Sequence, residues 1–404
     1  MKRSITIIGG GPSALMLAAQ LDEQKFDITI YERNAALGRK FLVAGDGGFN
    51  LTHSEKTEQF ISRYTPAPFF KEIISAFNSE DLRKWFKSIG IETFVGSSKR
   101  VFPVKEIKPI DVLNAILNVI KQKNISIKTK HIWQGWNNNQ LVFTDASTPE
   151  NKELLVKSDI VVFALGGASW KVTGSDGTWS AFFADKKINI IPFQPSNCAF
   201  EIKWNKPFID VAEGQSLKNI SLFCDGLEKK GELVITKFGL EGGAIYALSP
   251  AIRKQLNDKK SAQLFLDLKP SIGLDEIKNK LIHKGNKSLS KQLTSVLNIN
   301  EVQLALLKTI LTKDEFTKPE LLAKKIKTLP LIITDLAHID DAISTVGGIA
   351  LTEIDDNFQL KKMPNHYVIG EMLDWDAPTG GYLLQGCFSM GYGLANRLNT
   401  SLND

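Results

Sequence analysis

The chain opens with an apolar segment, a glycine-rich turn and a helical pattern, and this order limits how the rest can fold. Residues 5–8 (ITII) lead into residues 9–14 (GGGPSA), and a second strand-like segment ends at Glu32. A strand, a G-x-G-x-x-A turn, a helix, a strand and an acidic residue are typical of a dinucleotide-binding βαβ unit. The sequence therefore predicts an α/β domain with a parallel sheet.

The small residues of this turn have separate predicted roles. Gly9 permits the tight turn, Gly11 lets a pyrophosphate approach the backbone, and Ala14 lets the helix pack closely on the strand. The helix N-terminus offers free N–H groups to the phosphates. Glu32 is expected to accept a hydrogen bond from a ribose hydroxyl group. A βαβ unit that binds no nucleotide is the alternative interpretation.

The composition is that of an ordinary globular protein. The 404 residues are 43% hydrophobic and 23% charged, and no apolar run approaches the roughly 20 residues of a membrane span. The first strand begins so early that no signal peptide is expected, which predicts a cytoplasmic location. The three cysteines form no closely spaced pair and the five histidines are scattered, so neither a redox disulfide nor a metal site is expected.

Positive charge is concentrated between residues 251 and 330. This segment holds 16 Lys and Arg against 8 Asp and Glu, whereas the whole chain has a net charge of +6. A local positive field can attract a polyanion such as RNA. Solvated lysines on helix surfaces are the alternative explanation, and the sequence leaves both open.

Strand-like segments that end in glycine recur at 159–167 and 366–370, and a last helix is expected over 385–399. The segment between them alternates polar and apolar residues at first and then becomes helical and rich in lysine. We therefore predict a nucleotide domain that is interrupted by insertions. The predicted parts are a nucleotide domain (1–190 and 346–404), a β-barrel-like domain (191–245 and 331–345) and a helical domain (246–330).

Two glycine-bearing loops indicate a flavin rather than a nicotinamide as the resident cofactor. The loop after Glu32 is long and carries Arg39 and Lys40, a basic pair that suits a pyrophosphate. Glu371 or Asp374 can hold a ribityl hydroxyl group. The backbone at residues 380–382 can stabilise negative charge on a reduced flavin. No second strand–turn–helix glycine motif is visible, so a nicotinamide donor would bind transiently or share the pocket.

Together these motifs resemble bacterial flavoproteins known as BaiN-like, or aminoacetone-oxidase-like, NAD(P)/FAD-dependent oxidoreductases. The resemblance covers nearly the whole chain and includes residues 9–12, 100–103, 164–170, 173–177, 239–243, 347–349 and 370–374. It implies a split Rossmann-like FAD-binding domain of the two-dinucleotide-binding-motif type, with inserted β-barrel and helical domains and non-covalent FAD. Many relatives have GGGRCN where this chain has GDGGFN at 45–50, so the presumed active loop departs from the family pattern.

The resemblance implies reduction of a C=C bond by flavin hydride transfer with NAD(P)H as donor, on a small molecule or on a uridine of ribosomal RNA. RNA contact would use residues 251–330. A small-molecule oxidase or reductase and a non-catalytic flavin-binding protein are the alternatives. The oligomeric state cannot be predicted from the sequence.

Placement beside the presumed flavin makes Cys387 and Tyr382 the candidate proton donors. A packing role is the alternative for Cys387. The expected cofactor-binding residues are Gly9, Gly11, Pro12, Ser13, Ala14, Glu32, Arg33, Gly38, Arg39, Lys40, Gly47, Asn50, Leu51, Ile132, Ala164, Gly166, Gly167, Gly370, Glu371, Asp374, Gly380, Gly381, Tyr382 and Leu383.

Overall fold

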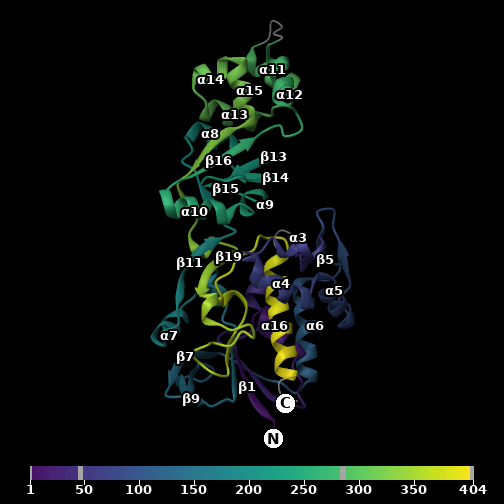
Figure 1. Ribbon diagram of the computed structural model, residues 1–404, viewed down its shortest axis with the longest axis vertical. Coiled ribbons are helices and arrows are strands. Elements are labelled where there is room, and N and C mark those ends of the chain that lie inside the picture. Colours follow the sequence, from purple (N-terminus) through teal and green to yellow (C-terminus); the bar gives the residue numbers. More distant parts are fainter. Residues whose placement is uncertain (1, 44–48, 283–287, 401–404) are drawn as a thin grey trace. The chain divides into compact units, whose positions relative to one another are not determined.

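The described residues form two units, each with its own hydrophobic core. The computed structural model describes residues 2–43, 49–282 and 288–400 (Figure 1). The first unit comprises Met1–Gln194 and Ile343–Asp404, and the second comprises Pro195–Ala342. The chain thus leaves the first unit once and returns to it. No helix among the described residues is both long enough and apolar enough to cross a bilayer.

A parallel sheet organises the first unit. Its five strands have the order β20-β10-β1-β2-β6, and every neighbouring pair is parallel. The strands are β1 (Arg3–Ile8), β2 (Phe26–Glu32), β6 (Ser126–Thr129), β10 (Ile160–Phe163) and β20 (His366–Val368). All four residues of β10 are buried, as in a parallel sheet covered on both faces. The predicted Rossmann-type α/β fold is confirmed.

Helices from the two ends of the chain pack together beside this sheet. Helix α1 (Pro12–Gln20) lies against α16 (Tyr382–Thr400), which is the long yellow helix in Figure 1. Gly391 permits the close crossing, because a Cβ atom there would lie 2.4 Å from the Ser13 carbonyl oxygen. The N-terminal and C-terminal segments therefore build one unit.

The expected start of the last helix was wrong. Helix α16 begins at Tyr382, directly after Gly380 and Gly381, whose φ angles are +111° and +99°. These two glycines adopt left-handed backbone angles and end the irregular segment. The helix therefore starts three residues before the position that the spacing of apolar residues indicates. Cys387 consequently lies in the second turn of the helix rather than at its N-terminus.

Smaller elements complete the first unit. A three-stranded antiparallel sheet follows the strand β6. Its strands are β7 (His131–Asn137), β8 (Gln140–Asp145) and β9 (Lys152–Val156). The other elements are α2 (Arg39–Val43), α3 (Thr57–Ile61), α4 (Ala67–Ala76), α5 (Ser79–Ser88), α6 (Pro109–Gln122), α7 (Ser180–Asp185), β3 (Thr52–His53), β4 (Thr93–Val95), β5 (Arg100–Pro103), β19 (Ser344–Ile349), three short 3₁₀ turns, and β11 (Ile190–Ser196), which continues into the second unit.

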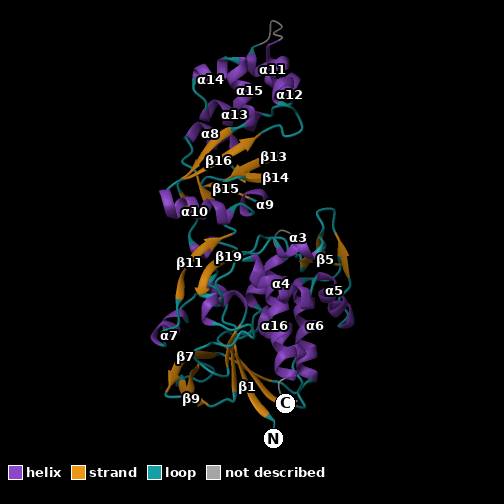
Figure 2. Cartoon of the chain, in the orientation of Figure 1, coloured by secondary structure: helices purple, strands orange, loops and turns teal. Residues whose placement is uncertain are grey.

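The second unit combines a seven-stranded sheet with helices (Figure 2). Its strands in sheet order are β17 (Leu329–Ile333), β16 (Ala262–Asp267), β13 (Ser216–Cys224), β14 (Leu227–Ile235), β15 (Gly239–Glu241), β12 (Phe200–Glu201) and β18 (Asp335–Leu336). The first and last strands are consecutive in the chain, so one segment, 329–336, joins both edges of the sheet. Its helices are α8 (Lys206–Ala212), α9 (Gly243–Tyr246), α10 (Ser249–Lys259), α11 (Leu274–Ile282), α12 (Leu289–Leu297), α13 (Glu301–Ile310), α14 (Lys313–Thr317) and α15 (Pro319–Lys327).

Strand β16 falls inside the segment 246–330 for which a helical pattern was expected. It pairs with β13 on one side and β17 on the other. Helix and sheet residues of the second unit share one hydrophobic core. An amphipathic six-residue segment between helices is hard to identify from sequence because its pairing partners lie about 40 and 65 residues away.

Candidate functional site

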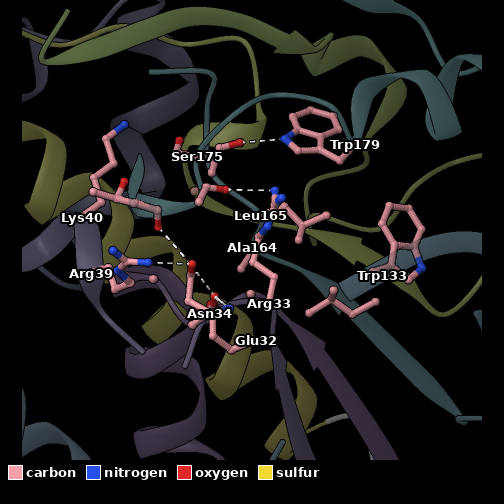
Figure 3. A pocket seen from close by; sticks show the side chains of 18 of the residues that line it. Glu32, Arg33, Asn34, Arg39, Lys40, Trp133, Ala164, Leu165, Ser175 and Trp179 are labelled. Atoms are coloured by element: carbon pink, nitrogen blue, oxygen red, sulfur yellow. Dashed lines mark hydrogen bonds between the residues drawn. The ribbon is translucent and has the colours of Figure 1, made fainter. Parts of the chain in front are cut away.

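A cavity of about 510 Å³ lies at the carboxyl ends of the strands of the parallel sheet (Figure 3). Its volume is in the range of small-ligand and cofactor sites. The chain runs from β1 to β2 and β6 on one side of the sheet and places β10 and β20 on the other. The cavity is therefore at the point where the strand order reverses, which is where open α/β sheets bind ligands.

The turn between β1 and α1 forms one wall of the cavity. Gly9 has φ +103°, and a Cβ atom there would lie 2.4 Å from the carbonyl oxygen of Ala164. Gly11 differs, because a Cβ atom there would meet nothing within 4 Å. Gly11 is also the N-cap of α1 and provides no side-chain cap. The space beside Gly11 and the uncapped helix N-terminus fit the pyrophosphate of a dinucleotide.

Glu32 closes the next part of the cavity from the end of β2. Its carboxylate Oε2 accepts a hydrogen bond from the Gly10 N–H at 2.8 Å, and Oε1 accepts from the Asn34 N–H at 2.7 Å. Burial raises the pKa of Glu32, and the hydrogen bonds from Asn34 and Gly10 oppose that rise. Because Oε2 accepts one hydrogen bond from the described part of the protein, it can also accept one from a ribose hydroxyl group.

Three basic side chains line the cavity, and each is held by a partner. Arg39 donates to the Oδ1 atom of Asn34 at 2.9 Å. Lys40 donates to the hydroxyl of Ser169 and to the carboxylate of Glu371, both at 3.0 Å. The third, Arg33, pairs with an aspartate in the segment after β10. In Figure 3, Arg39 and Lys40 lie on the same side of the pocket.

The ends of β10 and β20 supply another wall. Ala164, Gly166 and Gly370 line the cavity. A Cβ atom at Gly370, whose φ is +81°, would lie 2.5 Å from the hydroxyl oxygen of Ser13. The indole N–H of Trp179 donates to the Gly166 carbonyl at 3.0 Å. Two glycine-bearing strand ends far apart in the chain thus meet at one cavity.

Cys387 reaches the cavity from α16. Burial, and to a smaller extent the negative charge of Glu371, raise the pKa of its thiol to about 12, although a hydrogen bond with Ser13 opposes the rise. The Cys387 side chain is therefore a protonated thiol at neutral pH.

Tyr382 is not among the residues that line the cavity. Its hydroxyl donates to Oε1 of Glu55 at 2.6 Å, and the guanidinium of Arg63 donates to both oxygens of the same carboxylate at 3.0 and 2.8 Å. Its ring stacks on the imidazole of His53, with a centroid distance of 5.2 Å. Burial and the Glu55 carboxylate together raise the pKa of Tyr382.

The cavity brings together many of the expected cofactor-binding residues. Those that line it are Gly9, Gly11, Pro12, Ser13, Glu32, Arg33, Gly38, Arg39, Lys40, Ile132, Ala164, Gly166, Gly370 and Glu371. Those absent from its lining are Ala14, Asn50, Leu51, Gly167, Asp374, Gly380, Gly381, Tyr382 and Leu383. Gly47 lies outside the described residues.

Some of the residues outside the lining have clear packing roles. A Cβ atom at Gly167 would lie 2.1 Å from the hydroxyl of Thr345, and one at Gly381 would lie 2.5 Å from the backbone of Thr52. Asp374 accepts a hydrogen bond from the Gly347 N–H at 3.0 Å. These positions are constrained by neighbouring protein atoms.

Sequence reasoning missed part of the cavity wall. The missed lining residues include Asn34, His131, Trp133, Gln134, Thr173, Gly174, Ser175, Asp176, Thr178 and Trp179. The run TGSDG at 173–177 belongs to the segments that resemble the family, and its two glycines and polar residues are a signal that it approaches a ligand.

Comparison with known proteins agrees with this geometry. The family model described as HI0933-like protein Rossmann domain matches residues 3–397. A 3-dehydro-bile acid delta(4,6)-reductase of Clostridium scindens is 24% identical over 97% of this chain and 98% of that protein. A ribosomal RNA dihydrouridine synthase of Haemophilus influenzae is 22% identical over 96% of both chains.

Solved structures show the same fold at low identity. A 3-ketosteroid-delta4-(5alpha)-dehydrogenase from Rhodococcus jostii RHA1 has a TM-score of 0.51 and 12% identity, over 98% of this chain and 96% of that chain. A flavocytochrome c3 fumarate reductase has a TM-score of 0.50 and 13% identity, over 100% of this chain and 79% of that chain. The chain therefore belongs to the HI0933-like Rossmann-domain family and is an FAD-dependent oxidoreductase.

Proposed function

We propose that this protein reduces a C=C bond of a small unsaturated molecule, with FAD as the hydride carrier and NAD(P)H as the electron donor. The observation that carries the proposal is a protonated thiol, Cys387, in the wall of the dinucleotide cavity. Reduction of an activated C=C bond needs a hydride for one carbon and a proton for the other. Bound FAD would supply the hydride, and we assign the proton to the thiol.

The names of the relatives support this reaction class. A delta(4,6)-reductase and a dihydrouridine synthase both describe the saturation of a C=C bond. In both substrates the double bond is conjugated with a carbonyl group, which stabilises the negative charge that forms as the hydride arrives. We propose a conjugated enone as the substrate class.

The residues of the cavity divide the work of binding and proton transfer. Gly11 and the α1 N-terminus accommodate the pyrophosphate, and Glu32 accepts a ribose hydroxyl hydrogen bond. The ammonium group of Lys40, fixed by Glu371, places positive charge beside the cofactor. The Cys387 thiol gives its proton to the substrate carbon that does not receive the hydride and regains a proton from water.

A uridine of ribosomal RNA is the alternative substrate, and the relatives that carry the dihydrouridine name favour it. The basic segment 251–330 would then contact the RNA backbone. Several of its lysines are paired locally, for example Lys327 with Asp267 at 2.6 Å and Lys325 with Glu315 at 2.9 Å. The net positive charge of the segment remains and supports this alternative.

An anaerobic spectroscopic experiment tests the proposal. The purified protein should show a flavin absorbance that NADH or NADPH bleaches and that a conjugated steroid enone restores, with the saturated ketone as product. Restoration only by ribosomal RNA, with RNA affinity that falls steeply with salt, would favour the alternative. A flavin that no unsaturated acceptor reoxidises, but that oxygen reoxidises, would overturn reductase activity in favour of an oxidase.

A further inference from the structure

The segment from Trp170 to Thr178, which we call the strap, lines the cavity after the end of β10. Thr173, Gly174, Ser175, Asp176 and Thr178 all contribute to the lining. The strap continues into Trp179, whose indole is bonded to the Gly166 carbonyl. The proposed function gives the strap no role.

Residues that follow Glu32 hold the strap in place. The guanidinium of Arg33 lies 2.6 Å from Oδ2 of Asp176. The Nδ2 group of Asn34 donates to the Thr173 carbonyl at 3.1 Å and to Oε1 of Glu32 at 2.8 Å. Because Glu32 also faces the expected ribose position, the strap and the cofactor-binding carboxylate belong to one hydrogen-bonded network.

The backbone of the strap is shaped for this close contact. Gly174 has φ +98°, and a Cβ atom there would lie 2.4 Å from Nδ2 of Asn34. A side chain at position 174 would therefore both strain the backbone and displace Asn34. The next residue, Ser175, is thereby held against the cavity.

The hydroxyl group of Ser175 is buried and has no hydrogen-bond partner among the described residues. The residue is 6% exposed and lines the cavity. A Cβ atom at Gly166 would lie 3.4 Å from its Oγ atom, so the hydroxyl lies beside a glycine strand end that also faces the cavity. In Figure 3, Ser175 is drawn among the pocket residues, with Trp179 nearby. A buried hydroxyl without a partner is costly, and a ligand oxygen can satisfy it.

We propose that Ser175 donates a hydrogen bond to an oxygen atom of bound FAD, and that the Arg33–Asp176 pair is the latch that holds it there. The inference rests on FAD binding in this cavity. When the Arg33–Asp176 ion pair breaks, the strap moves away from the cavity and the hydrogen bond from Ser175 to FAD is lost. The ion pair and the hydroxyl group therefore retain the cofactor together.

The first test compares Ser175→Ala with wild type for the rate of FAD release and for apoprotein unfolding. FAD release, followed by the recovery of flavin fluorescence after dilution, should be about 3- to 10-fold faster, as expected for one hydrogen bond. The apoprotein should be no less stable, because the substitution removes an unpartnered hydroxyl. If Ser175→Ala releases FAD faster and also lowers the free energy of unfolding of the apoprotein by a corresponding amount, Ser175 has a structural role and the ligand assignment is overturned.

Ser180→Ala is the matched control. Its hydroxyl donates to the Gly177 carbonyl at 2.8 Å, and Ser180 does not line the cavity. This variant should lose a little stability and release FAD at the wild-type rate. If Ser180→Ala accelerates release as much as Ser175→Ala does, the effect is not specific to the cavity and the proposal fails.

A double-mutant cycle tests the latch. Asp176→Asn alone should speed FAD release. In the Asp176→Asn background, Ser175→Ala should accelerate release by less than half as much as it does in the wild-type protein. Additive effects would overturn the coupling between latch and hydroxyl. A wild-type protein that takes up no FAD would instead overturn the proposed function, so the two failures are distinguishable.

Discussion

The ammonium nitrogen of Lys40 lies 3.0 Å from Oε2 of Glu371, although the two residues are 331 positions apart in the chain. Lys40 follows the first βαβ unit, and Glu371 follows the last strand of the same sheet. The Oε1 atom of Glu371 also accepts a hydrogen bond from the Thr345 N–H at 3.2 Å. The pair therefore links the two parts of the split nucleotide domain at the cavity wall.

Lys40→Met should weaken both the domain and FAD binding. The side chains of Lys40 and Glu371 are 27% and 15% exposed, so a loss of about 1 kcal/mol in the free energy of unfolding is expected after allowance for solvent screening. Urea unfolding of the apoprotein measures it. Lys84→Met is the control, since Lys84 is 77% exposed and 3.8 Å from its partner Asp81. Equal losses in both variants would contradict a special role for Lys40.

Substitutions at Gly9 and Gly11 should have opposite signatures. Gly11→Ala should leave the apoprotein within about 1 kcal/mol of wild type, because the φ of Gly11 is −82° and a Cβ atom there meets nothing within 4 Å. It should weaken FAD binding at least about tenfold, because the methyl group fills the space beside the helix N-terminus. Gly9→Ala should cost about 2 kcal/mol or more in stability, since its φ and the Ala164 carbonyl exclude a side chain. Calorimetric unfolding and FAD titration separate the two effects. Tight FAD binding by Gly11→Ala would place the pyrophosphate elsewhere.

Cys387→Ala should separate the two halves of the catalytic cycle. Bleaching of the flavin by NAD(P)H should proceed at the wild-type rate, because it needs no proton from the thiol. Reoxidation by the enone should slow by about 10²- to 10⁴-fold, the usual contribution of a general acid. Stopped-flow absorbance measures both steps. Unchanged reoxidation with bound FAD would remove Cys387 from the mechanism and leave it a packing residue.

Tyr382→Phe should reduce stability while leaving FAD binding intact, because the phenol lies outside the cavity lining. Burial raises the pKa of Glu55, but the hydrogen bonds from Arg63 and Tyr382 outweigh it, so the pKa of Glu55 in the folded state is lowered. The stability that this carboxylate contributes is therefore present above its ordinary pKa, near 4.5, and is lost as the pH falls through its lowered value.

Removal of the Tyr382 hydroxyl should reduce this acid sensitivity, because the folded-state pKa of Glu55 then moves back toward its unfolded value. Unfolding free energies at pH 4 and pH 7 measure the difference for Tyr382→Phe and wild type. A larger pH dependence in the variant would contradict the assigned hydrogen bond. Loss of FAD binding would instead place Tyr382 at the cofactor.

Local signals in the sequence were sufficient for the βαβ unit, the Gly9 turn and the acid at Glu32. Each depends on residues within one short segment, where backbone geometry and hydrophobic period are set by near neighbours. The β7–β9 sheet depends on near neighbours in the same way, since each of its strands pairs with the next strand along the chain. The start of α16 was misplaced by three residues because two left-handed glycines, rather than periodicity, decide where that helix begins.

The sequence by itself determined that this chain has a parallel nucleotide-binding sheet, an uncapped glycine-rich helix start and a second glycine-rich segment near its end. Tertiary structure alone decided which of those residues share a cavity. It directed Tyr382 to Glu55 and Arg63, and it placed the strap with Ser175 against the cavity. These contacts join segments more than a hundred residues apart in the chain. They form because burial and packing lower the free energy of the folded state, and no local sequence pattern encodes them.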